Sequence, residues 1–174
     1  SVEEAGWLDG LFRYCGDFSI NKSQAILLDS RFSKVQLGTT SSVVGETKSD
    51  NLRIENINNL VLESGYTDIN IGTLSNKLSF NVSYGSFNIE RVPEGFESIE
   101  LESRYAGIRI GIDESASYKL EGKVSYGGLK FNEDNFKNTK RNVENTSTTV
   151  EGIVGKEESP TAFVRVDSSY GTIK

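Results

Sequence analysis

Three glutamates are the side chains of this sequence best suited to chemistry. Glu100, Glu102 and Glu121 occupy a repeated strand pattern that would bring them within one strand spacing of each other. Paired carboxylates at about such a separation act as acid and base in glycosidases. The same spacing also suits a charged surface in water, on which Lys123 screens Glu102. We favour the solvated surface, and we predict no catalytic residue.

Other reaction types lack the residues that they need. The chain contains no histidine, which removes the commonest general base and metal ligand and excludes a Ser-His-Asp or Cys-His arrangement. Cys15 is the only cysteine, so no intrachain disulfide and no Cys/His zinc site can form. No calcium loop or glycine-rich phosphate loop is present. We predict no cofactor and no metal, and we interpret Cys15 as a small filler side chain at a corner.

The charge distribution argues against nucleic acid as a partner. The 174 residues carry 19 basic and 25 acidic side chains, for a formal net charge of −6. Residues 121–174 hold eight of each, so the acidic excess lies in residues 1–120, with 11 basic and 17 acidic side chains. Lys and Arg form no cluster of the kind that binds phosphates. No apolar run is long enough for a transmembrane segment, and we expect that the chain, which begins at Ser1, has been processed or trimmed.

The elements that would position these residues follow a repeat centred on an aromatic residue. Apolar residues lie six, four and often two positions before it, a two-residue period typical of one face of a strand. The next residue is small, and apolar residues return three and five positions after the aromatic. This shift of the alternation predicts a bulge or a corner at the small residue. Six copies follow the rule, centred on Phe32, Tyr66, Tyr84, Tyr105, Tyr126 and Tyr170, and a seventh, at Tyr14, is imperfect.

The repeat predicts an all-β fold in which short units stack in register. The intervals between neighbouring aromatics are 18, 34, 18, 21, 21 and 44 residues. We favour a β-solenoid with about 20 residues per coil and roughly eight coils over an antiparallel β-sandwich, in which tight hairpins should alternate with the strands. The interval of 34 is not a clean multiple, and we interpret that of 44 as two units whose middle aromatic is missing.

The aromatic rings are expected to form a stacked ladder in the core. Their positions continue the inward parity of Phe80 and Leu101, so the rings should point inward. An exposed platform for sugar rings is the weaker interpretation. Outward positions three residues before each aromatic hold a second column, made of Asp29, Glu63, Asn81, Glu102, Lys123 and Asp167.

The whole chain, residues 1–174, is predicted to be one domain. Residues 1–11 are interpreted as an N-terminal cap, with room for one helical turn, over the open edge of the first coil. Residues 38–51 are rich in Ser, Thr and Gly, and predict a loop or irregular coil. Turns are predicted at residues 56–59, 93–95 and 156–160.

The C-terminal part divides into two segments of different composition. Residues 132–149 are nearly free of apolar residues and predict a mobile polar excursion. Residues 150–174 predict the C-terminal strands, which lead into the last copy of the repeat at Tyr170.

Two units of the repeat carry a resemblance to a known family. Both Tyr84-Gly85-Ser86-Phe87-Asn88-Ile89 and Ser169-Tyr170-Gly171-Thr172-Ile173-Lys174 resemble the bacterial adhesin β-solenoid family of Bacteroides-type organisms, which is related to the head domains of autotransporter adhesins. The resemblance covers most of the chain from about Leu52 onward. It implies a single-stranded right-handed parallel β-helix, export to the periplasm, outer membrane or cell surface, and adhesion to an unidentified glycan or protein. It supplies no catalytic residue.

Three functions are compatible with these features. We favour an exported, non-enzymatic, adhesin-like binding or structural module at the bacterial cell envelope. The alternative is a carbohydrate-active β-helix enzyme of the pectinase or lyase type, which would use Glu100, Glu102 and Glu121. The third is an assembly component whose open coil ends join end to end.

Overall fold

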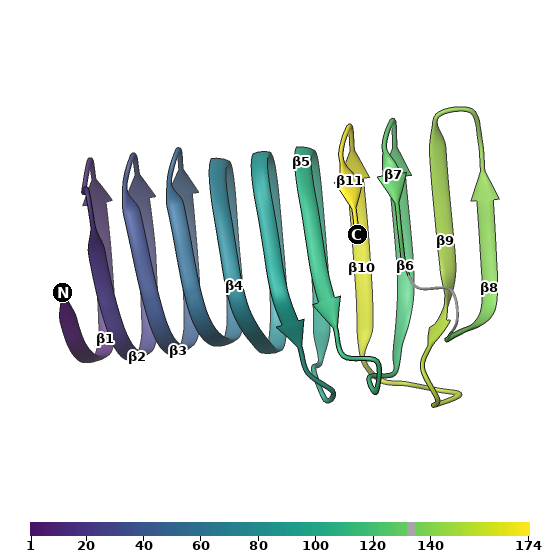
Figure 1. The fold of residues 1–174 in the computed structure, drawn as a ribbon, viewed down its shortest axis with the longest axis horizontal. Helices are drawn as coiled ribbons and strands as arrows, with labels where there is room; N and C mark the ends of the chain where they lie inside the picture. Colours follow the sequence, from purple (N-terminus) through teal and green to yellow (C-terminus); the bar gives the residue numbers. More distant parts are fainter. Residues whose placement is uncertain (132–134) are drawn as a thin grey trace.

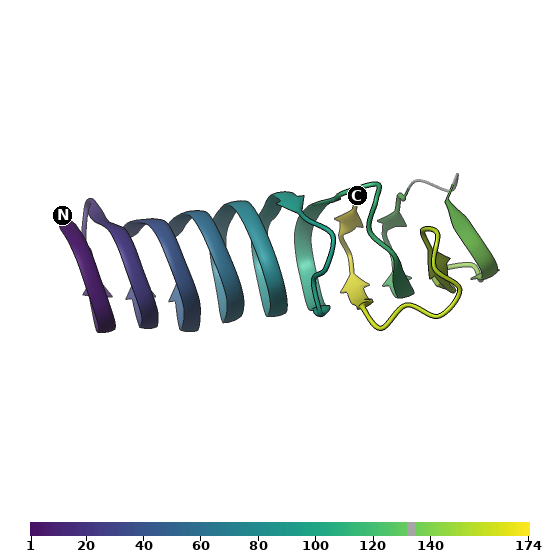
Figure 2. The ribbon, with the colours of Figure 1, turned by 90° about the horizontal axis from the view of Figure 1, so that it is seen from below.

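The structure, a computed structural model, describes residues 1–131 and 135–174. The described residues form one elongated stack of strands and contain no helix (Figure 1). Seen from below, the N-terminal half is a continuous winding of the chain around the long axis of the molecule (Figure 2). The N-terminus lies at one end of the stack, whereas the C-terminus lies inside it (Figure 1).

The strands account for most of the chain. In chain order they are β1 (Val2–Arg13), β2 (Phe18–Arg31), β3 (Lys34–Lys48), β4 (Asn51–Val92), β5 (Ser98–Ile112), β6 (Tyr118–Ser125), β7 (Gly128–Leu129), β8 (Phe136–Val143), β9 (Ser147–Val154), β10 (Phe163–Ser169) and β11 (Thr172–Ile173).

The first five strands are parallel, and each is hydrogen-bonded to the equivalent part of the next coil. The register pairs residue 2 with 20, 18 with 35, 34 with 51, and 77 with 98. A coil therefore takes 17 to 21 residues, from the differences 18, 17, 17 and 21. The predicted parallel β-solenoid is confirmed, and the antiparallel sandwich is excluded.

Stacking in register places like residues in columns, and the inward columns form the core. One such column, six residues before the corners, includes Ile26, Val43, Leu60, Leu78, Ile99, Leu120 and Val164, none of which is more than 7% exposed. Burying a side chain of this kind stabilises the fold by about 1.5–3 kcal/mol. The core is therefore continuous along the solenoid, as the apolar periodicity predicts.

The corner after each strand reverses the direction of the aromatic side chain. Every aromatic of the repeat has a positive φ, between 53° and 61°. This left-handed conformation interrupts the alternation of a strand, so the ring points outward and the small residue after it faces the interior. The predicted ladder forms, but its inward orientation is wrong: Tyr66 is 60% exposed and Tyr105 50%. The alternation of inward and outward side chains along a strand does not continue past a residue with left-handed backbone conformation.

The interval of 34 residues consists of two coils of 17 residues each. Ser49 has φ 58° and lies between Phe32 and Tyr66, at 17 residues from each (49 − 32 and 66 − 49). The register pairs Arg31 with Lys48 and Lys48 with Gly65, so these coils stack without a gap. Ser49 therefore occupies the corner position of a coil whose aromatic ring is absent.

The interval of 44 residues does not consist of two stacked units. The order of strands in the sheet is β5-β10-β6-β9-β8, so the C-terminal strand β10 lies between β5 and β6. In the same way, β11 pairs with both β5 and β7. The chain leaves β7 and forms β8 and β9 beyond β6. It then returns as β10, which occupies the position between β5 and β6.

The predicted polar excursion is largely a β-hairpin. Residues 132–134 lie outside the described residues, whereas β8 and β9 pair antiparallel with each other, and β9 pairs antiparallel with β6. The hairpin covers the edge of β6, whose backbone N–H and C=O groups would otherwise lack partners. Polar side chains suit this position because every residue of β8 after Phe136 is exposed to water. Composition alone therefore predicted mobility where edge pairing imposes order.

Three further segments also differ from the predictions. Residues 1–11 are not a cap with a helical turn, because β1 pairs along its length with β2 as the first coil. Residues 38–51 belong mainly to β3, and residues 56–59 lie inside β4. Outward positions face water and the backbone pairs with the neighbouring coils, so Ser, Thr and Asn are compatible with these strands.

The other two predicted turns are confirmed. Residues 93–95 contain a turn between β4 and β5, and residues 156–160 lie in bends between β9 and β10.

Candidate binding surface

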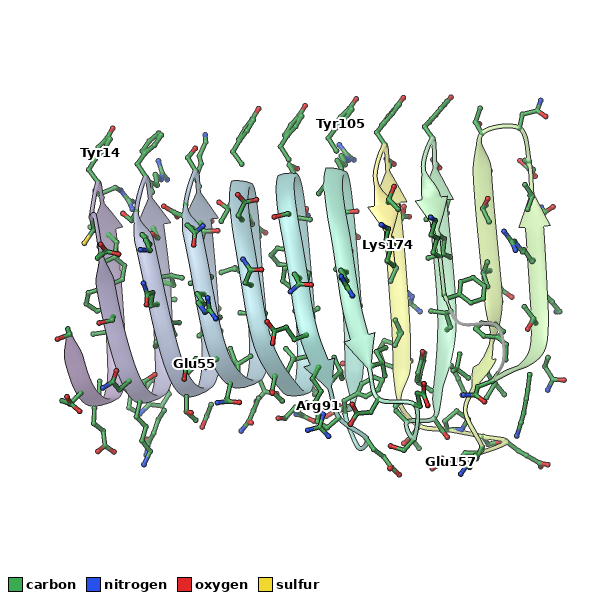
Figure 3. All side chains as sticks on the ribbon, viewed as in Figure 1. Tyr14, Glu55, Arg91, Tyr105, Glu157 and Lys174 are labelled. Carbon is green, nitrogen blue, oxygen red and sulfur yellow. The ribbon has the colours of Figure 1, made fainter. Side chains whose placement is uncertain are left out.

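Seven stacked rings, which we call the aromatic ridge, run along one edge of the solenoid. In spatial order they are Tyr14, Phe32, Tyr66, Tyr84, Tyr105, Tyr170 and Tyr126. In five of the six neighbouring pairs the ring centroids lie 4.7–5.1 Å apart and the ring planes differ by 4–7°, whereas the corner of Ser49 separates Phe32 from Tyr66. Figure 3 shows this row of side chains projecting from the upper edge, with Tyr14 and Tyr105 labelled. The ridge crosses from the regular coils into the C-terminal strands.

Where rings are stacked on both sides, the ridge exposes ring edges rather than ring faces. A ring stacked on both sides, such as Tyr84 or Tyr105, has both faces covered by its neighbours. A sugar that stacks on an aromatic ring needs a free face, so the interior of the ridge does not form a sugar platform. It offers instead a row of phenol hydroxyls, each able to donate and accept a hydrogen bond.

The strands that precede the ridge form a grooved face with an acidic column. The register aligns Asp29 with Glu46, Glu46 with Glu63, Asn81 with Glu102, and Glu102 with Asp167. These are the positions three residues before each corner, so the column predicted from the sequence is confirmed. Glu46 is a further member, which the sequence analysis missed because its coil lacks an aromatic marker.

A second column on the grooved face changes character along the solenoid. After Asp9 in β1, its next members, Leu27, Val44 and Val61, are apolar yet 43–54% exposed. Farther on, the column contains Glu100 and Arg165, which pair across β5 and β10. A groove of about 590 Å³ lies over both parts and is also lined by the acidic column. The groove is therefore apolar near the N-terminal end and charged near β10.

The three predicted glutamates are not brought together. Arg165 in β10 lies between Glu100 in β5 and Glu121 in β6, and its Nε donates a hydrogen bond to Oε2 of Glu121 over 3.0 Å. The expected proximity of Glu121 to the other two is wrong, because the sequence did not reveal the insertion of β10. For the same reason Lys123 lies opposite Asp167 rather than opposite Glu102.

Glu102 and Asp167 are one pair of carboxylates that face each other on neighbouring strands. Both side chains are exposed on the grooved face. A general acid at neutral pH needs a pKa raised by burial or by a nearby like charge. Side chains exposed in a column on the surface are not buried in this way. The described residues also contain no group of carboxylates and cysteine arranged to hold a metal ion. The geometry suits a charged docking surface better than an acid–base site.

A family model described as Toastrack DUF4097 matches residues 15–174, which include nearly every coil described above. The chain belongs to this family. No curated protein and no solved structure matches it. A Toastrack domain is a β-solenoid-like unit, which suits a structural or binding module. Membership therefore agrees with the resemblance at the level of the fold.

The small residues inside the corners of this Toastrack chain support the ridge from below. The buried Asp50 carboxylate accepts hydrogen bonds from the backbone N–H of Ser33 at 2.6 Å and of Lys48 at 3.1 Å. Its own N–H donates to Oγ1 of Thr67 over 3.2 Å, and the half-buried Cys15 donates its N–H to Oγ of Ser33. Burial raises the pKa of Asp50, although the hydrogen bond from Ser33 acts in the opposite direction. The corner interior is thus a hydrogen-bonded column.

None of residues 1–131 or 135–174 lies in a helix long and apolar enough to cross a bilayer.

Proposed function

We propose that this Toastrack solenoid is an exported, non-enzymatic, adhesin-like module of the bacterial cell envelope or surface. It binds a glycan or protein ligand through the aromatic ridge and the grooved face beside it. The carrying observation is the ridge, whose rings are each 41–79% exposed along one line. Large apolar side chains gathered in an exposed patch mark interaction sites on soluble proteins. Aromatic residues are also the side chains enriched at binding hot spots.

The grooved face supplies the specificity in this proposal. Its acidic column and its exposed Leu27, Val44 and Val61 lie alongside the ridge over several coils. A ligand that followed the solenoid axis would meet one ridge position and one grooved-face position at each coil. A repeated surface of this kind suits an extended polymer or a polypeptide segment, which gains affinity from many weak contacts.

Binding is tested on arrays of glycans and extracellular proteins with the purified chain. We expect Tyr84→Ser with Tyr105→Ser to weaken binding by about tenfold or more, because hot-spot aromatics contribute about 2 kcal/mol each. Asn70→Ala, an exposed change in β4 beyond the corner, is the matched control and should leave binding unchanged. Array binding that is indifferent to the double ridge variant would overturn the proposed binding surface.

The enzyme alternative has its own test. Glu100 and Glu102 line the same groove as Arg165 and Asp167, so hydrolysis or elimination is assayed by new reducing or unsaturated ends from polysaccharides. We expect no turnover. Turnover that disappears in the combined variant Glu100→Ala, Glu102→Ala and Glu121→Ala would establish the enzyme and sink the non-enzymatic proposal. Export is checked by cell fractionation of the full-length protein, and recovery in the cytoplasm alone would contradict it.

A further inference from the structure

The aromatic ridge is interrupted at a single corner, and the interruption has the shape of a binding slot. Ser49 has the same left-handed backbone as the ring residues on either side, with φ 58° against 53° for Phe32 and 57° for Tyr66. The coil of Ser49 is stacked in register with both neighbouring coils. Only the ring is missing, so Phe32 and Tyr66 each present one face toward the space above Ser49, which we call the ring slot.

The ring slot has room for one planar ring. Neighbouring coils are separated by about 4.8 Å, so the corners of Phe32 and Tyr66 lie about 10 Å apart along the axis. A ring at the midpoint would lie one coil spacing from each wall. That distance matches the 4.7–5.1 Å between ring centroids in the rest of the ridge. An aromatic ring in the slot would therefore reproduce the stacking found at the other corners.

The walls of the ring slot are held in place before anything binds. Phe32 stacks on Tyr14 with ring planes 5° apart, and Tyr66 stacks on Tyr84 with the same angle. Each wall is thus oriented by a neighbour on the side away from the slot. Tyr66 is 60% exposed, whereas Tyr84, which has rings on both sides, is 41% exposed. The higher value of Tyr66 is what an uncovered face predicts, whereas Phe32, at 51%, is about as exposed as Tyr105, at 50%. Pre-oriented walls reduce the ordering cost of binding.

The charged side chains nearest the ring slot favour a neutral ring with acidic neighbours. Arg31 and Lys48 are exposed at the positions just before the Phe32 and Ser49 corners, and both line a groove that reaches Tyr66. Asp29, Glu46 and Glu63 line the same groove, three positions before each corner and so farther from the slot. Arg31 has a long ion pair of 4.0 Å with Asp29, while Lys48 has none with any described residue. Two cations at the entrance would repel an incoming guanidinium or ammonium group. They would attract carboxylates on either side of an aromatic residue.

We propose that the ring slot between Phe32 and Tyr66 receives one aromatic side chain from an acidic segment of a partner protein. This inference rests on the proposed binding role and narrows it to a protein ligand at one corner. The partner's ring completes the ridge, and its carboxylates lie near Arg31 and Lys48. Aromatic pairs contribute beyond the area that they bury, and here the ring gains two such pairs at once.

The probe is a short peptide, acetyl-Glu-Tyr-Glu amide, titrated into the purified chain while the ring signals of Phe32 and Tyr66 are followed by NMR. Both sets of signals should shift together. Acetyl-Glu-Leu-Glu amide should bind about tenfold more weakly or worse, because it forms no ring stack. Acetyl-Lys-Tyr-Lys amide should also bind more weakly, because Arg31 and Lys48 repel it. Equal binding of the leucine peptide, or a monosaccharide that shifts the same signals more strongly, would overturn the inference.

Variants at Ser49 separate the slot from the rest of the surface. Ser49→Tyr fills the slot with a ring of the chain itself, so it should abolish peptide binding and raise the melting temperature, which also shows that it folds. Ser49→Gly leaves the slot open and relieves the positive φ, so it should retain binding. Tyr105→Ser removes a ring between Tyr84 and Tyr170 and should create a second slot. Unchanged peptide affinity in Ser49→Tyr would refute the slot as the site.

The slot and the broader binding role can fail separately. An array ligand that is lost in the ridge double variant but kept by Ser49→Tyr, together with no peptide binding, would uphold the proposed function and refute the slot. Peptide binding that is lost in Ser49→Tyr, without any ligand on the arrays, would uphold the slot and refute the adhesin-like role.

Discussion

The coils from β1 to β5 and the strands from β6 to β11 share one core and one ridge but differ in how the chain connects them. In the first region each coil stacks on the coil that precedes it, 17–21 residues earlier. In the second region, contacts join distant residues. The hydroxyls of Ser103 and Ser168, for example, are hydrogen-bonded at 2.7 Å across 65 positions of sequence.

Coils can stack in register even where the strands do not follow each other in the order of the sequence. A parallel edge left by β5 can be completed by any strand whose columns match, and β10 matches both β5 and β6. Contacts of low sequence separation form early in folding, and those that close long loops form late. The first region is therefore built by local propagation, whereas the second depends on the last residues of the chain.

Removal of residues 156–174 should have the largest effect on stability, and it should affect the C-terminal strands while leaving the regular coils folded. The truncation deletes β10 and β11, with the buried side chains of Val164, Val166 and Ile173. At about 1.5–3 kcal/mol for each, this loss is comparable to the whole stability of a typical domain. Hydrogen exchange should show lost protection in β6, β8 and β9, with β2 to β4 still protected. Full protection of β6 in the truncated chain would show that β10 is dispensable.

Leu60→Ala tests the core of the regular coils. Leu60 is fully buried in β4, so the substitution should lower the free energy of unfolding by about 2–5 kcal/mol, measured by urea denaturation. Val61→Ala, at the next and exposed position, is the matched control and should change it by less than about 0.5 kcal/mol. Equal effects of the two substitutions would contradict the assigned inward column.

Tyr170→Ala tests whether ring stacking connects the regular coils to the C-terminal strands. Tyr170 stacks on Tyr105 of the regular coils and on Tyr126 of the C-terminal strands. The loss of two ring pairs should cost about 1–3 kcal/mol of unfolding free energy. Tyr126→Ala, which removes one pair, should cost about half as much. Equal stability of the two variants in thermal and urea unfolding would show that stacking of Tyr170 on both regions does not add to the stability of the fold.

The pH dependence contributed by Asp50 should be the smallest effect. Burial raises the pKa of Asp50 in the folded state, so this group costs stability at neutral pH, and the cost falls as pH decreases through its folded-state pKa. Asp29 and Asp113 behave oppositely, because hydrogen bonds from Arg13 and Arg91 lower the pKa of each carboxyl. Their contribution is retained down to the ordinary value of about 3.9 and lost below it.

Thermal unfolding of Asp50→Asn and of the unmodified chain at pH 7 and pH 4.5 measures this effect. The melting temperature of the unmodified chain should rise relative to that of the variant as pH falls. An opposite trend would show that the hydrogen bonds from Ser33 and Lys48, rather than burial, determine the direction of the pKa shift of Asp50.

Much of the fold could be predicted from particular residues. The columns through Leu60, Leu78 and Ile99 followed from a two-residue period, and the corner followed from the shift at small residues such as Gly85 and Ala106. The acidic column was also visible in advance. The neighbours of the candidate glutamates were harder to predict from the sequence. Because β10 lies between β5 and β6, Asp167 is beside Glu102, and Glu121 is beside Arg165.

By itself, the sequence determined the stacked coils, the corner positions and the inward columns, because each depends on side-chain type within one repeat. Tertiary structure decided the outward direction of the rings, the place of β10 and the ring slot above Ser49. A ring follows the backbone conformation at its corner, and a strand edge accepts any partner that satisfies its hydrogen bonds. Neither choice is encoded in the spacing of apolar residues.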